Sequence, residues 1–232
     1  MDQTTLDSQR ATVRQHPRSF TEWPQRKGAL VAGVGLALMA GVAGFANFGA
    51  IAPLITRGDA VQTAQDISAS PVLFWSGVVG FVIVALLDIV VAGALYVVFR
   101  PVSRRLSAVA GWVRAIYGVL LAVCVSQLVI GFSLLDDPEA ALPVLESFST
   151  FWVIIQGLLF GVSLILVGYL AFRADFMAKV FGILLALAGL SYLADGIGTI
   201  FDPDFAIFAQ FLFAGEVVLI FWLLIRGRRL PA

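Results

Sequence analysis

Six long, mostly apolar stretches follow one another along this chain and leave little sequence between them. A bilayer core about 30 Å thick needs about 20 consecutive apolar residues at the helical rise of about 1.5 Å. Of the 232 residues, 60% are hydrophobic and 13% are charged, which is not the composition of a soluble domain. The chain is therefore predicted to be all-α, a polytopic transmembrane helical bundle. The predicted spans are 29–51, 74–99, 108–135, 148–172, 176–201 and 205–225.

The six predicted spans use up most of the chain, so one membrane domain is expected and no second soluble one. We expect a flexible cytoplasmic tail at 1–27, a single six-helix transmembrane domain at 28–226 and a cytoplasmic tail at 227–232. The first apolar stretch is longer than the core of a signal peptide, so it is interpreted as an uncleaved anchor. Between the first two spans, Gly58 and Asp59 start a predicted short surface helix that ends before Pro71.

The net charge of zero hides a strong asymmetry between the segments that separate the spans. Thirteen of the 15 Lys and Arg fall in every second segment: before the first span, after the second, between the fourth and fifth, and after the sixth. The intervening loops carry eight acidic residues against Arg57. The positive-inside rule then predicts that both termini are cytoplasmic and that the protein lies in the cell (inner or cytoplasmic) membrane.

The apolar stretches lack the residue types that several kinds of functional site require. His16 is the single histidine and lies in the N-terminal tail, while Cys124 is the single cysteine. No haem, zinc or other metal site and no His-assisted nucleophile is therefore predicted within the membrane, and no cofactor is expected. The sequence has no phosphate-binding glycine loop, and its basic residues follow the topology pattern, so no nucleic-acid partner is expected.

Four ionisable side chains lie inside the apolar stretches: Asp88, Arg114, Asp195 and Glu216. On insertion scales, each charge at the centre of a membrane helix costs about 2.5 to 3.5 kcal/mol. We therefore expect these side chains to face one another or water, with Asp88 on a helix face that it shares with Ala85 and Ala92. Because three acids and one base cannot all pair, at least one acid is expected to carry a proton near neutral pH.

Three uncharged polar residues are predicted at depths compatible with the charged ones. These are Gln127, Gln156 and Tyr192, and Tyr192 is one helical turn from Asp195. Together with the four ionisable residues they form the candidate set for ligand binding or proton coupling. No catalytic residue is assigned.

Three functional hypotheses fit this pattern. The first is a protein that binds or transports a small molecule or lipid in a proton-linked manner. In this hypothesis Asp88 and Glu216 lie at the midplane of the membrane, and Arg114 is their counter-charge. An outward vestibule is lined by Asp195, Tyr192, Gln156 and Gln127. The second is a membrane enzyme that acts on a lipid-like substrate, with Glu216 and Asp88 as an acid-base pair. The third is a structural or regulatory subunit, which a lipid-facing Glu216 would favour. The lipid bilayer is the one expected partner, and a homo-oligomer or another membrane protein stays open.

Short motifs in the chain resemble a family of bacterial membrane proteins. The motifs are Arg100-Pro101-Val102, Gly168-Tyr169-Leu170 with Arg173 and Phe176, Gly182, Leu187-Ala188-Gly189, Tyr192-Leu193-Ala194-Asp195 and Gly215-Glu216. They are similar to those of the family grouped as domain of unknown function 4386. The resemblance implies six helices in a bacterial inner membrane and no assigned activity. The chain departs from the family pattern at 174–178, where a Ser-Gly-Phe-Leu-Pro-like turn is expected, and at Gln156.

Overall fold

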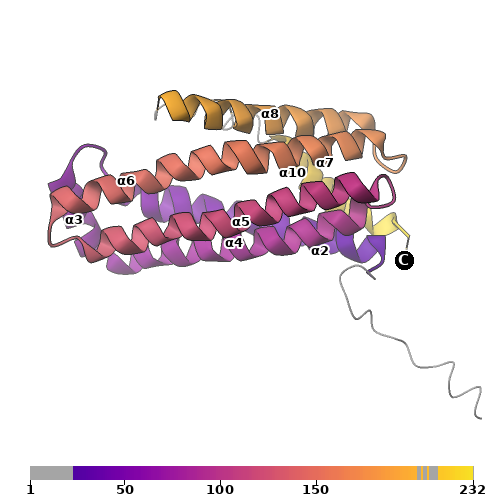
Figure 1. Ribbon diagram of the computed structural model, residues 1–232. Helices are drawn as coiled ribbons and strands as arrows, with labels where there is room; N and C mark the ends of the chain where they lie inside the picture. Colours follow the sequence, from indigo (N-terminus) through magenta and orange to yellow (C-terminus); the bar gives the residue numbers. More distant parts are fainter. Residues whose placement is uncertain (1–22, 203–204, 206–207, 209–213, 232) are drawn as a thin grey trace, which may run out of the picture.

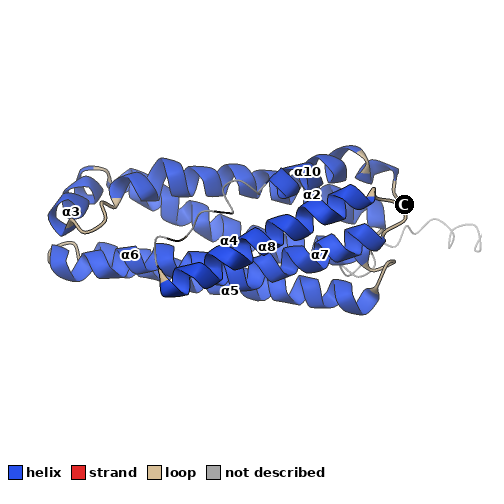
Figure 2. Ribbon diagram, turned by 90° about the horizontal axis from the view of Figure 1, so that it is seen from above, coloured by secondary structure: helices blue, strands red, loops and turns tan. Residues whose placement is uncertain are grey.

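The computed structural model describes residues 23–202, 205, 208 and 214–231, and every regular element among them is a helix (Figures 1 and 2). Five helical segments in this part of the chain are long and apolar enough to cross a membrane: Gln25–Leu54, Pro71–Phe99, Arg104–Ser133, Pro138–Arg173 and Lys179–Phe201. They run roughly along one axis and form an elongated bundle (Figure 1). The protein is thus an all-helical, multi-pass membrane protein.

Two of the long segments are built from more than one kind of helix. The first contains α2 (Gln25–Gly44), a π-helical segment η2 (Phe45–Ile51) and a 3₁₀ turn η3 (Ala52–Leu54). The fourth contains α6 (Pro138–Ile155), a π-helical segment η4 (Gln156–Gly161) and α7 (Val162–Arg173). The other elements are α3 (Ala60–Ala69), α4 (Pro71–Phe99), α5 (Arg104–Ser133), α8 (Lys179–Phe201), α10 (Ala214–Ile225) and η5 (Gly227–Arg229).

Helix starts follow local signals in the sequence. Asp59 caps the predicted short helix α3 by accepting a hydrogen bond at Oδ1 from the backbone N–H of Gln62, after Gly58 turns the chain with a φ of 72°. Pro71 begins α4 at a position where its missing N–H costs nothing.

The fourth span starts about ten residues earlier than predicted. Asp137 accepts a hydrogen bond from the N–H of Ala140, and Pro138 occupies the first helical position, so α6 begins in what the sequence pattern assigned to a loop. The hydropathy pattern missed this start because the first turns of α6 carry Glu139 and Glu146, which are not apolar.

The predicted sixth span at 205–225 is described as a helix for Ala214–Ile225 only. Phe205 and Phe208 lie outside any helix, so the helix does not run unbroken from 205, and residues 203–204, 206–207 and 209–213 lie outside the described part. The sixth span and the orientation of the termini therefore stay predictions.

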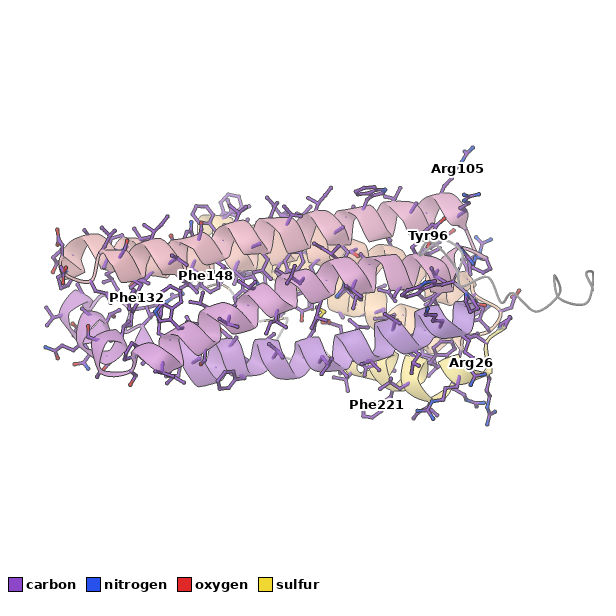
Figure 3. All side chains as sticks on the ribbon, turned by 90° about the horizontal axis from the view of Figure 1, so that it is seen from below. Arg26, Tyr96, Arg105, Phe132, Phe148 and Phe221 are labelled. Atoms are coloured by element: carbon purple, nitrogen blue, oxygen red, sulfur yellow. The ribbon has the colours of Figure 1, made fainter. Side chains whose placement is uncertain are left out.

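The two ends of the bundle differ in charge. At the end that holds the start of α2, Arg100 Nη2 donates to the carbonyl of Trp23 at 2.9 Å, and the N–H of Arg26 donates to the carbonyl of Pro231 at 3.2 Å. Arg26 and Arg105 project from this terminal end (Figure 3). At the opposite end, the N–H of Gly58 donates to Glu146 Oε1 at 2.9 Å. The basic segments therefore share one end of the bundle, as the charge pattern predicts.

The outer surface of the bundle is apolar, while glycine and alanine fill the close helix contacts inside it. Leu86 on α4, Val123 on α5 and Phe221 on α10 expose about half or more of their side chains (60%, 60% and 59%). Such a surface would be a liability in water but suits lipid tails. Helix α4 packs between α2 and α5, α7 packs on α8, and α10 packs against α2 and α8.

The contact between α8 and the α7–η4 segment depends on glycines from both sides. A Cβ atom built on Gly157 would lie 2.5 Å from Gly196 Cα, and one built on Gly182 would lie 2.6 Å from the Gly168 carbonyl oxygen. Backbones that approach this closely leave no room for any side chain, and such contacts drive helix association in lipid. This contact gives Gly182 a packing role, whereas no described residue lies within 4 Å of a Cβ built on Gly41 of α2.

We expect Gly157→Ala to lower the free energy of unfolding by about 1 to 3 kcal/mol, because the added methyl group meets backbone that cannot move alone. Gly41→Ala is the matched control and should not destabilise the protein, because no described residue lies within 4 Å of a Cβ built there. Unfolding by SDS in mixed micelles measures both. Equal stability of the two variants would contradict the assigned interface.

Candidate functional site

Asp88 on α4 and Arg114 on α5 form an ion pair inside the bundle. Arg114 Nη2 lies 2.8 Å from Asp88 Oδ1, and the two side chains are 1% and 0% exposed. A charge in the interior must be paired because desolvation costs several kcal/mol for each ion. The Arg114 side chain is long enough to reach toward the membrane surface, but it points into the bundle instead.

Small residues on both helices bring the pair together. On α4, Asp88 shares its buried face with Ala85 and Ala92, as the sequence predicts. On α5, Gly111 and Gly118 flank Arg114: a Cβ built on Gly118 would lie 2.8 Å from the Ala85 carbonyl oxygen, and one on Gly111 would lie 3.3 Å from that of Ala92. The two backbones therefore approach each other above and below the ion pair.

Aromatic side chains enclose the guanidinium. Arg114 Cζ lies 4.6 Å from the ring centroid of Phe160, which belongs to the π-helical segment η4. Tyr117 follows Arg114 by one turn of α5, is 3% exposed and packs on Phe160 with ring centroids 5.3 Å apart. The Tyr117 hydroxyl accepts a hydrogen bond from Trp152 Nε1 at 3.1 Å. A desolvated cation over an aromatic face gains about 2 kcal/mol.

Glu216 approaches the same place from α10. Its carboxyl lies within electrostatic range of Arg114 and Asp88 and interacts with the Tyr192 hydroxyl of α8. The side chain is half-buried, and its Oε1 atom is fully buried. Glu216 is therefore not fully exposed to lipid. Three of the four predicted ionisable residues lie within electrostatic range of one another, and we call Asp88, Arg114 and Glu216 the charged cluster.

The three charged residues lie at one depth. Asp88 is 11 residues before the end of α4, Arg114 is 10 residues after the start of α5, and Glu216 is 9 residues before the end of α10. At a rise of about 1.5 Å for each residue, all three lie about 15 Å from the terminal end. This is about half the thickness of a bilayer core.

The hydrogen-bonding capacity of the cluster is not used up within the described part of the chain. Beyond the ion pair of Arg114 Nη2 with Asp88 Oδ1, no described residue offers a hydrogen-bond partner to Arg114 Nε and Nη1, Asp88 Oδ2 or Glu216 Oε1. A crevice between α4, α5 and α7 reaches Arg114 past Ser107, but it is too narrow for a water molecule. Buried polar atoms without partners are uncommon in native proteins, and a catalytic role, an ion or a water molecule are among their explanations.

In the described part of the chain, Asp195, Gln127 and Gln156 form no ion pair or hydrogen bond with Asp88 or Arg114. Asp195 is 3% exposed and accepts a hydrogen bond at Oδ1 from the N–H of Phe208 at 2.9 Å, so it connects α8 to the backbone of Phe208. Gln127 is 13 residues beyond Arg114 on α5, about 20 Å along the helix. Gln156 is half-buried and begins η4, one turn before Phe160.

Sequence reasoning missed three residues of the cluster: Tyr117, Phe160 and Gly118. Tyr117 and Gly118 follow Arg114 by three and four residues, a spacing that places them on one helix face and that could have identified them. Phe160 carries no such signal because it comes from a different helix. Among the described residues, no group of three or more His, Cys, Asp or Glu is arranged to hold a metal ion.

Comparison with known proteins places the chain in a family. A model of the domain of unknown function 4386 family (DUF4386) matches residues 31–227. The chain belongs to this family. It is also 29% identical over 153 residues to an uncharacterized protein of the archaeon Archaeoglobus fulgidus, a match that covers 66% of this chain and 85% of that protein. The DUF4386 match confirms the resemblance found in the motifs, and the archaeal relative shows that similar chains are not restricted to bacteria. No solved structure matches the chain.

We expect Asp88 and Glu216 to be energetically coupled through Arg114. After Asp88→Asn or Glu216→Gln, the other carboxylate still serves as a partner of the guanidinium, whereas Asp88→Asn/Glu216→Gln leaves the cation alone. The double variant should therefore lose at least about 1 kcal/mol more stability than the two single variants together. Thermal unfolding in detergent gives the three values.

The exposed Asp136 at the opposite end of the bundle supplies the control. Asp88→Asn combined with Asp136→Asn should be additive, because the two sites are far apart. Additivity in both double variants would show that Glu216 does not share Arg114 with Asp88.

Proposed function

We propose that this protein binds and transports a small molecule or lipid through the cluster formed by Asp88, Arg114 and Glu216. The carrying observation is the buried Arg114 guanidinium, which contacts the Asp88 carboxyl group, lies within electrostatic range of the Glu216 carboxyl group and has donors that no described residue satisfies. Intramembrane charges of this kind mark substrate, ion and proton pathways. Tyr192 and Tyr117 supply hydroxyl groups on two sides of the site.

Charge balance favours proton coupling. Arg114 neutralises one carboxylate, and the second leaves one negative charge at the depth of the bilayer midplane. A proton taken up by Asp88 or Glu216 removes that charge. A substrate anion that binds Arg114 displaces a carboxylate from the guanidinium, and the displaced carboxylate then binds a proton more readily. Binding and protonation are thereby linked.

A movement of the helices is part of this proposal because the crevice that reaches Arg114 is narrow. Helix α10 is the element suited to move. It carries Glu216 and packs on α2 and α8, while Asp88 and Arg114 belong to the glycine-lined contact between α4 and α5. Separation of Glu216 from Arg114 would open the site without breaking the Asp88–Arg114 pair.

The orientation proposed with this function follows the charge pattern. Both termini and the basic terminal end face the cytoplasm, and the protein lies in the cell membrane. The acidic end, with α3 and the start of α6, then faces outward. An enzyme that uses Glu216 and Asp88 for acid-base chemistry is less favoured, because Asp88 is held by Arg114 and the described residues place no metal site beside them.

Native mass spectrometry of protein extracted in mild detergent tests the proposal. We expect a stoichiometric adduct on the wild-type protein that is lost in Asp88→Asn or Glu216→Gln and kept in the matched surface variant Asp136→Asn. The mass of the adduct names the ligand, and its flux into proteoliposomes then separates transport from binding. A bare wild-type protein together with destabilised cluster variants would instead assign the cluster to assembly of the bundle.

A further inference from the structure

A second place in the molecule has the chemistry of a binding site, independent of the charged cluster. A groove of about 670 Å³ lies at the terminal end, between the start of α8 and the end of α10. Its walls include Phe181, Val218, Phe221, Trp222, Arg226 and Arg229. Phe221 projects outward from the bundle (Figure 3), and its side chain is 59% exposed, so the groove opens toward the lipid-facing side.

The groove is apolar along its length and positive at one end. Val218, Phe221 and Ile225 succeed one another along one face of α10, and Arg226 and Arg229 follow directly where the helix ends. Among the residues that the structure describes, no acidic one lines the groove. No ion pair is found for Arg226 or Arg229 within the described part of the chain, and both side chains are exposed.

A neighbouring groove of about 610 Å³ shows the contrast. It lies on the other side of Phe176, and its lining contains Arg173 together with Asp175, so that its charges cancel. The groove along α10 thus carries two uncompensated positive charges, whereas its neighbour carries none. Selectivity for an anion is expected of the first groove alone.

We propose that the α10 groove binds an anionic phospholipid. The headgroup phosphate lies against Arg226 and Arg229, and an acyl chain follows Phe221 and Val218 toward the middle of the membrane. Basic pockets between helices at the cytoplasmic side recognise anionic headgroups, and guanidinium groups match the geometry of phosphate oxygens. Trp222 lies one helical turn before Arg226 and adds an indole ring to the wall of the groove near its charged end, and tryptophan is enriched at membrane interfaces.

Titration with phosphatidylglycerol, followed by native mass spectrometry, tests the site. Arg226→Gln/Arg229→Gln should weaken the apparent affinity about 30-fold, at about fivefold for each charge near the membrane surface. Arg228→Gln is the matched control: Arg228 is exposed at the same helix end but does not line the groove, so its affinity should stay close to that of the wild type. Phosphatidylcholine should bind more weakly than phosphatidylglycerol to the wild type.

Three results would overturn the proposal. If Arg228→Gln weakens lipid affinity as much as Arg226→Gln/Arg229→Gln does, the effect belongs to general surface charge. If the wild type binds phosphatidylcholine as tightly as phosphatidylglycerol, the site is only an apolar groove. If the wild type binds no lipid, the groove has another occupant, such as a partner protein. Arg226→Lys/Arg229→Lys separates loss of charge from loss of fold, because it keeps the charge and should keep most of the binding. Asp88→Asn should keep the lipid, so failure of this site and failure of the central site are distinguishable.

Discussion

The rest of this bundle depends on one buried ion pair, between Asp88 on α4 and Arg114 on α5. The Asp88–Arg114 pair lies about 15 Å from the terminal end of the bundle, about half the thickness of a bilayer core, and neither side chain can be left there without the other. The requirement that the two charges meet fixes the rotation of α4 and α5 about their axes. Gly111 and Gly118, opposite Ala92 and Ala85, allow the close approach that this rotation needs.

Close backbone packing holds the second half of the bundle in place. Lipid tails are as apolar as leucine, so helices in a membrane gain little from burying large apolar side chains against each other. Glycines on α8 and on the α7–η4 segment instead let the two backbones touch. The π-helical segment η4 joins this interface to the charged cluster, because Gly157 contacts α8 while Phe160 lies under Arg114. Local widening of a helix is frequent at functional sites.

The clearest predictions from sequence concern residues related by the geometry of a single helix. The buried small face around Asp88 and the capped start of α3 at Asp59 both follow from local spacing, and the structure confirms them. The fate of Arg114 does not follow from spacing. Its side chain is long enough either to extend toward the membrane surface or to turn inward. It turns inward because Asp88 and Phe160, from two other helical segments, bind its guanidinium group there. The apolar neighbours of Glu216 on α10 likewise gave no sign of which side faces the bundle.

The sequence by itself determined that the chain is a multi-pass, helical membrane protein with charged ends of opposite sign, because hydropathy and charge are sums over consecutive residues. It also determined that Asp88, Arg114, Asp195 and Glu216 needed partners. Only the tertiary structure decided which partners they have. It brings Glu216 to the Asp88–Arg114 pair and turns Asp195 to the backbone of Phe208. The physical reason is that the order and rotation of helices depend on contacts between distant segments, and no local pattern records those contacts.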